Sequence, residues 1–233
     1  SGSAEDQEAQ EEFEDFRIVT NSMQQQGQQW IMLTYCWGNR DSETGQYDMQ
    51  QCVIKVFKRL IGVHGLPCWL DVFGGMGGDV YEAMARGVRG AAVVVPFLSR
   101  AYDSSANGQR ELKFACNLKK PLVPVMAEAG FDHNESAWLG VCVPSELYHP
   151  IDPRSANDVF DQQVDGLAEA IKKQLTGMSL RLRWPGSTEA DDVDDGEAAQ
   201  LEGVRVAKLR SLVRLTKRVG DQGAGRRPSS SHT

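Results

Sequence analysis

One glutamate in this chain lies where its charge could take part in chemistry. At about 100° per residue, the apolar side chains of residues 109–118 form one arc of a helix, and Glu111 falls near its middle, whereas Lys113 and Asn117 face away. The pattern therefore predicts a helix that turns a carboxylate inward. Because an unpaired carboxylate is costly to bury, such a residue either forms a salt bridge or helix-end contact, or lines a cleft where a ligand meets it. The helix by itself leaves both readings open.

The elements that must position Glu111 alternate between short apolar runs and amphipathic stretches. This order favours a parallel sheet covered by helices on both faces. The apolar runs predict strands at residues 31–35, 68–72, 92–98 and 122–126, with a weaker fifth near 147–149. Helical spacing of apolar residues predicts the first helix over 49–60 and the last over 160–175.

Two prolines, Pro96 and Pro124, fall inside predicted strands. Each removes a hydrogen-bond donor from the ladder, so we expect those strands to end early or to leave the proline position unpaired. The alternation of elements still predicts a doubly wound sheet. Such sheets bind ligands beyond the carboxyl ends of their strands, where the strand order reverses. The expected cleft is therefore lined by residues 35–40, 71–74 and 99–102.

Charge and composition divide the 233 residues into one folded unit and its flanks. Residues 1–29, which begin with an apparent expression scar at 1–3, are Gln-rich and carry seven acids and one base, so we expect a flexible lead. Residues 30–176 form the folded domain, and 177–200 form an acidic linker. Residues 201–233 carry eight bases and two acids and predict a basic, partly helical tail. The net charge of −7 does not favour nucleic-acid binding.

Cysteine and histidine usage excludes some classes of site. The five cysteines form an odd set, mostly in apolar runs and without CxxC spacing, which favours reduced thiols in a cytoplasmic protein. The four histidines lack metal-ligand spacing, so no metal site is expected. No apolar run reaches the roughly 18 residues that a membrane span requires.

Several segments, taken in order, resemble a TIR (Toll/interleukin-1 receptor/resistance) domain of the NAD-cleaving type. The resemblance covers about residues 30–175 and is carried by residues 34–37, 66–78, 81–88, 94–102, Glu111 and 120–125. It implies a flavodoxin-like α/β fold of about five strands. It also implies that Glu111 is the catalytic carboxylate of NAD⁺ cleavage, with NAD⁺ as substrate and no separate cofactor. At Asn107 and Gly108 the chain departs from relatives that carry tryptophan or cysteine there.

The other candidate site residues follow from the strand ends and from the resemblance. Tyr35 and Trp37 are expected to contact substrate through their rings, and Arg40 is expected to meet a phosphate. Phe73 is expected to cover the ribose, and Asp71 to anchor its loop by bonding the backbone. The run Gly74, Gly75, Met76, Gly77 and Gly78 lacks the lysine of a phosphate-binding loop and resembles the loop through which TIR domains self-associate.

Three functional classes remain open from the sequence. The first is a self-association-activated NAD⁺ glycohydrolase in immune or cell-death signalling, releasing nicotinamide with ADP-ribose, a cyclic variant or a base-exchange product. The second is a non-enzymatic TIR adaptor, in which Glu111 would form a structural ion pair and the partners would be other TIR domains. The third is a nucleoside-transferase-like enzyme, which would ignore NAD⁺.

Overall fold

The computed structural model describes residues 13–178 apart from 15, 18, 19, 22, 25, 26, 44, 74–79 and 144–147, and also residue 182. The predictions for the glycine-rich loop at 74–78, for the acidic linker beyond residue 182 and for the basic tail lie outside the described residues.

A five-stranded parallel sheet forms the centre of the fold, with the strand order β2-β1-β3-β4-β5. The strands are β1 (Trp30–Thr34), β2 (Cys68–Trp69), β3 (Ala91–Leu98), β4 (Val125–Met126) and β5 (His149–Pro150). All residues of β1 and β3 are buried, which explains why their sequences are continuous apolar runs rather than alternating ones.

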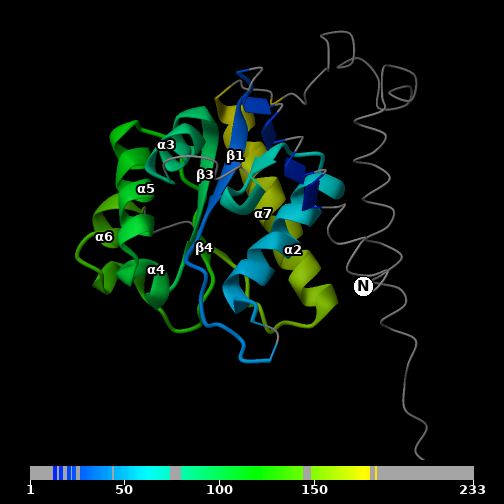
Figure 1. Cartoon of the computed structure of the whole chain (residues 1–233), viewed down its shortest axis with the longest axis vertical. Coiled ribbons are helices and arrows are strands. Elements are labelled where there is room, and N and C mark those ends of the chain that lie inside the picture. The colour runs from blue at the N-terminus through cyan, green and yellow to red at the C-terminus, as the bar shows by residue number, and fades with distance from the viewer. Residues whose placement is uncertain are drawn as a thin grey trace, which may run out of the picture. The chain divides into compact units, whose positions relative to one another are not determined.

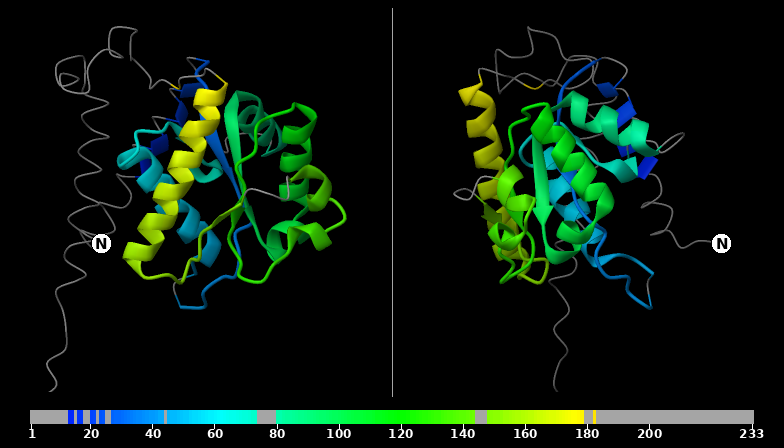
Figure 2. Two further views of the ribbon diagram at one scale, coloured as in Figure 1. Left: turned by 180° about the vertical axis from the view of Figure 1, so that it is seen from behind. Right: turned by 90° about the vertical axis from the view of Figure 1, so that its left-hand side faces the viewer.

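Helices cover both faces of the sheet (Figures 1 and 2). Helices α2 (Asp48–Gly62) and α7 (Asn157–Gly177) pack together on one face, and α3 (Val80–Gly90) and α5 (Ala106–Asn117) pack together on the other. The shorter elements are η1 (Asp71–Phe73), α4 (Arg100–Ser104), η2 (His133–Glu135) and α6 (Leu139–Cys142). The predicted doubly wound, flavodoxin-like fold is confirmed.

The two prolines affect their strands differently. Pro96 does not end β3, which continues to Leu98. The Val94 amide donates to the Pro121 carbonyl at 2.9 Å, so the nitrogen two residues later, at Pro96, faces the same edge of the strand. On that edge Leu122 forms an isolated bridge with Val94, and the ladder resumes only at Val125, the first residue of β4, directly after Pro124. Pro96 is therefore unpaired on the side of β4, although it pairs with Thr34 of β1 on the other side. The strand predicted over 122–126 is shortened to Val125–Met126.

The segment 1–29 was expected to be a flexible lead. From residue 13 onward, its described residues are instead ordered. The described residues among 13–24 are helical, and Phe16, Thr20 and Met23 are buried. The Phe16 ring meets the ring of Phe57 on α2 edge-on, with centroids 5.2 Å apart. These three residues recur at helical spacing, a signal that is hidden when the segment is assessed by its acidic and Gln-rich composition.

Candidate active site at the strand-order reversal

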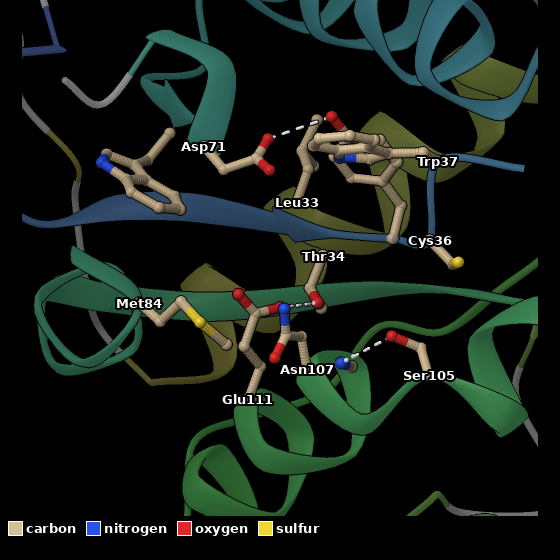
Figure 3. Close-up of a pocket in the computed structure, with 12 residues that line it drawn as sticks. Leu33, Thr34, Cys36, Trp37, Asp71, Met84, Ser105, Asn107 and Glu111 are labelled. Carbon is tan, nitrogen blue, oxygen red and sulfur yellow. Dashed lines mark hydrogen bonds between the residues drawn. The ribbon is translucent and has the colours of Figure 1, made fainter. Parts of the chain in front are cut away.

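The sheet reverses its strand order between β1 and β3, and a cavity of about 290 Å³ lies beside the carboxyl end of β1. This is the position at which doubly wound sheets bind ligands. Side chains from β1, the loop after it, η1, α3 and the start of α5 meet around the cavity (Figure 3). They are Leu33, Thr34, Tyr35, Cys36, Trp37, Trp69, Asp71, Met84, Ser105, Asn107, Gly108 and Glu111.

Glu111 projects from α5 into this cavity, as its place on the apolar arc predicts. Its neighbours Leu112 and Ala115 are fully buried, and Glu111 itself is partly buried. Among the described residues no Lys, Arg or His forms an ion pair with it. The geometry therefore favours the cleft-lining reading of Glu111 over the structural salt bridge.

The pKa of Glu111 is raised from 4.5 to about 7. Burial is the largest cause, since the cavity wall is a poorer solvent for a charge than water, and the nearby Asp71 carboxylate adds to it. A hydrogen bond from the Thr34 hydroxyl to Glu111 Oε2 acts in the opposite direction and favours the charged form. The carboxyl group thus titrates near neutral pH.

Two capped turns fix where α5 begins. Ser99 caps α4 by accepting from the Tyr102 amide at 3.1 Å, and Ser105 caps α5 by accepting from the Gly108 amide at 3.1 Å. A side chain at Gly108 would begin 3.0 Å from the Tyr102 ring, so glycine lets this ring pack closely against the first turn of α5. Glu111 lies one turn later, and its direction follows from these contacts.

Two hydroxyls are linked to Glu111: that of Thr34, which was not among the predicted site residues, and that of Tyr102, which was expected in the cleft segment 99–102. Thr34 Oγ1 lies 3.2 Å from the Tyr102 hydroxyl, and Thr34 also donates to Glu111. Thr34 is 1% exposed and Tyr102 is fully buried. The sequence signal for Thr34 is a polar residue at the end of an otherwise apolar strand. The expected cleft segment 99–102 does not line the cavity; Ser105, Asn107 and Gly108 contribute instead.

Asp71 is a second carboxylate in the cavity wall, and it is held by hydrogen bonds. The Tyr35 hydroxyl donates to Asp71 Oδ1 at 3.0 Å, and the Val72 amide donates to the same oxygen at 2.8 Å. Burial raises the pKa of Asp71, while these hydrogen bonds and one from Trp37 lower it. The predicted bond from Asp71 to its own loop is present. Tyr35 presents its hydroxyl to Asp71, so its contribution to a ligand would come from its ring.

Trp37 and Arg40 differ in their relation to the cavity. Trp37 lines it and remains 43% exposed, with its ring 5.1 Å from that of Tyr47. Arg40 is not among the described lining residues, and its Nε donates to the Gly45 carbonyl at 3.1 Å, which ties the loop after β1 together. Phe73 ends η1, and its side chain lies outside the described structure.

A second hollow of about 280 Å³ lies between α3 and α5 and shares Met84 and Glu111 with the first. Its rim carries Arg110, whose Nη1 donates to the Tyr81 hydroxyl at 2.8 Å. Arg110 is the residue directly before Glu111, but its guanidinium is directed to Tyr81 on α3 and not to the Glu111 carboxylate.

Neither a metal centre nor a membrane span is found in the part of the chain that the structure describes. No three potential ligands among His, Cys, Asp and Glu come together there. No helix in that part is long and apolar enough to cross a bilayer.

Comparisons with known proteins agree with the resemblance. The sequence pattern of the TIR domain matches residues 44–168. The TIR domain of the Toll-related receptor TRR-2 from Hydra magnipapillata is 12% identical with a TM-score of 0.43, and the match covers 61% of this chain and 97% of that one. The TIR domains of the activated Roq1 resistosome, which directly recognises the pathogen effector XopQ, are 20% identical with a TM-score of 0.34, covering 64% and 84%. No curated protein matches the chain.

The family match at residues 44–168 begins just before α2, runs through β2 to β5 with their helices, and ends within α7. It therefore includes Asp71 and Glu111, and it spans more than half of the chain. On this match, the chain belongs to the TIR-domain family.

Proposed function

We propose that this TIR domain is an NAD⁺ glycohydrolase that cleaves the bond between nicotinamide and ribose, with Glu111 as its catalytic residue. The observation that carries the proposal is a carboxylate without a cationic partner among the described residues, facing a cavity at the strand-order reversal. A purely structural carboxylate in such a place would be expected to have a salt-bridge partner.

The proposed reaction needs only one carboxylate. Nicotinamide in NAD⁺ is cationic, so it leaves with the electron pair of the C–N bond as a neutral molecule, and no general acid is required. The ribose carbon becomes oxocarbenium-like, and ionised Glu111 stabilises the positive charge that develops there. Water then adds to this carbon and loses a proton, which gives ADP-ribose. Addition of a nitrogen of the adenine ring or of another base would give a cyclic or exchanged product.

The aromatic and polar wall of the cavity supports a ligand of this class. The Trp37 ring at the edge and the Tyr35 ring beside it offer flat apolar faces for nicotinamide or adenine. Asp71 is expected to hold the loop that carries Phe73 rather than to react. Arg40 lies outside the described cavity wall, so a phosphate contact by Arg40 would require the loop after β1 to move.

We further propose that self-association activates the enzyme, in immune or cell-death signalling. TIR domains pair with other TIR domains, and residues 74–78 resemble the loop that mediates this pairing. Glycine loses more backbone entropy on ordering than other residues, so ordering a segment with four glycines on assembly would carry a large entropic cost.

The pH dependence of nicotinamide release provides the first test. Only ionised Glu111 can stabilise the developing positive charge, so kcat/KM for NAD⁺ should rise as the pH increases and reach a plateau, with a midpoint near the pKa of about 7. The measurement is nicotinamide release from NAD⁺ between about pH 5.5 and 9, the range in which the fold is expected to persist.

A parallel incubation with nucleosides that lack the nicotinamide cation separates the enzyme classes. Release of base from uncharged nucleosides at a comparable rate would favour the nucleoside-transferase class. A flat pH profile with NAD⁺ would argue against Glu111 as the ionising catalytic group.

A further inference from the structure

We propose that Thr34 and Tyr102 are positioning residues that hold Glu111 through a directed chain of hydrogen bonds, leaving one carboxylate oxygen to act on the substrate. The proposal rests on the proposed function for its catalytic consequence. The hydrogen-bond chain itself can be tested without any substrate.

The direction of the hydrogen bonds follows from the donors that are available. The Thr34 hydroxyl has one hydrogen, and an ionised carboxylate can only accept, so this hydrogen is directed to Glu111 Oε2. The Tyr102 hydroxyl, 3.2 Å from Thr34 Oγ1, must then be the donor of that pair. The same hydroxyl also donates to the Gly108 carbonyl at 3.4 Å, so its one hydrogen is shared between two acceptors, of which Thr34 Oγ1 is the nearer. Donation thus runs from Tyr102 through Thr34 to the carboxylate, and bonds in such a chain strengthen one another.

Tyr102, the first donor in this series of hydrogen bonds, is held rigidly. Tyr102 is fully buried in a cluster with Leu98, Leu112 and Leu139. The cap that Ser99 places on α4 fixes the backbone of Tyr102. The phenol oxygen of Tyr102 therefore has a fixed place, within reach of Thr34 Oγ1 and of the Gly108 carbonyl. Thr34 is equally fixed, because it ends the buried strand β1. The carboxylate of Glu111 is consequently held from two other elements of the fold, β1 and α4.

The two oxygens of Glu111 then have different roles. Oε2 accepts from Thr34, whereas Oε1 has no hydrogen-bond partner among the described residues, and the close-up in Figure 3 shows the carboxyl group at the cavity next to Met84. A carboxylate free to rotate would present either oxygen. One that is held by Oε2 presents Oε1 in a fixed place, which is the preorganisation that stabilisation of a developing charge requires.

The charged and titratable groups around Glu111 come from each element packed against it. Asp71 on η1 opposes its ionisation. Burial first, and the Glu111 charge to a lesser extent, raise the pKa of Tyr35 after β1 and of Tyr102 on α4. From α3, Met84 faces it without a charge. Arg110, its neighbour on α5, is turned toward Tyr81. The Thr34 hydroxyl is thus the group that favours the ionised form of Glu111.

The test is a carboxyl-carbon NMR titration of Glu111 in the protein without substrate, with the signal assigned from its loss in Glu111→Gln. Thr34→Val removes the hydroxyl and keeps the branched shape, and it should raise the pKa of Glu111 above that of the wild type by about 1 to 2 pH units, the size of one charge-assisted hydrogen bond. Thr34→Ser restores the donor and should titrate as the wild type does. Tyr102→Phe, which keeps the buried ring, should give a smaller rise.

An unchanged Glu111 pKa in folded Thr34→Val and Tyr102→Phe would overturn the proposal. If Thr34→Val fails to fold, Tyr102→Phe compared with wild type decides by the same criterion. If the wild type cleaves NAD⁺, the midpoint of the pH–rate profile should move upward in Thr34→Val and return to the wild-type value in Thr34→Ser. A merely structural role would lower the rate equally at every pH and leave the midpoint in place. A shift in the pKa of Glu111 in these variants, with no NAD⁺ cleavage by the wild type, would support the hydrogen-bond chain and reject only the proposed function.

Discussion

Glu111→Gln should reduce nicotinamide release from NAD⁺ by at least about 100-fold, because a neutral amide cannot stabilise the positive charge of the transition state. The same change should make the domain more stable at alkaline pH. Glutamine has nearly the shape of glutamate and its amide oxygen can still accept from Thr34, so the fold should persist. Both effects are measurable on one preparation, the first by nicotinamide release and the second by denaturant unfolding.

The sign of the stability effect follows from the raised pKa. Glu111 titrates at about 7 in the folded chain, against an ordinary value of 4.5. The neutral form is therefore favoured by folding, and this contribution is lost as the pH rises from about 4.5 through 7. At pH 8 the ionised group is held in a poor environment, and its replacement should raise the free energy of unfolding by about 2 kcal/mol, with a smaller gain at pH 5.

Glu169→Gln is the matched control for this experiment. Glu169 lies on α7 in an exposed pair with Lys172, 3.0 Å apart, and its replacement should change stability by less than about 0.5 kcal/mol at either pH. A loss of stability in Glu111→Gln at pH 8 would indicate that Glu111 has a structural ion pair, as the adaptor reading requires.

Gly90→Ala should lower the free energy of unfolding by about 1 to 3 kcal/mol or more. Gly90 ends α3, and a Cβ atom there would lie 2.1 Å from Cζ2 of Trp30. The indole cannot easily withdraw, because Trp30 is 4% exposed and its Nε1 donates to the Gly87 carbonyl at 3.0 Å. The clash therefore forces the helix or the first strand to move. Urea unfolding followed by circular dichroism measures the loss.

The same substitution at Gly166 should have the opposite effect. Gly166 lies within α7, and a Cβ atom there would meet nothing within 4 Å. Alanine should stabilise the domain by about 0.5 to 1 kcal/mol, since it restricts the unfolded chain and favours the helix. Equal effects of the two substitutions would contradict the packing of α3 against Trp30.

The sheet and the place of Glu111 could be predicted because both depend on local patterns. Buried parallel strands appear in the sequence as continuous apolar runs, and Glu111 interrupts an apolar helical arc. The short strands β2 and β4 were predicted too long, since their lengths depend on partners elsewhere in the sheet: the β4 ladder is interrupted where Pro96 faces it.

The support of Glu111 could not be predicted from such patterns. Thr34 and Tyr102 meet only because β1 and α4 adjoin in the fold, 68 residues apart in the chain. Tyr102 was expected at the cleft from its place after β3, but it points into the core, and the chain turns toward the cavity only at Ser105. Arg40 was assigned to the site from its charge, whereas the structure shows it bonded to its own loop.

Nicotinamide release from NAD⁺ by wild type and Glu111→Gln, compared over a series of protein concentrations, tests the central claim most directly. An assembly-gated enzyme should release nicotinamide at a rate per molecule that rises with wild-type concentration, and the folded variant should release none above background. No release by the wild type at any concentration, including conditions in which it is shown to self-associate, would contradict the enzymatic function and favour a TIR domain that acts only by binding other TIR domains.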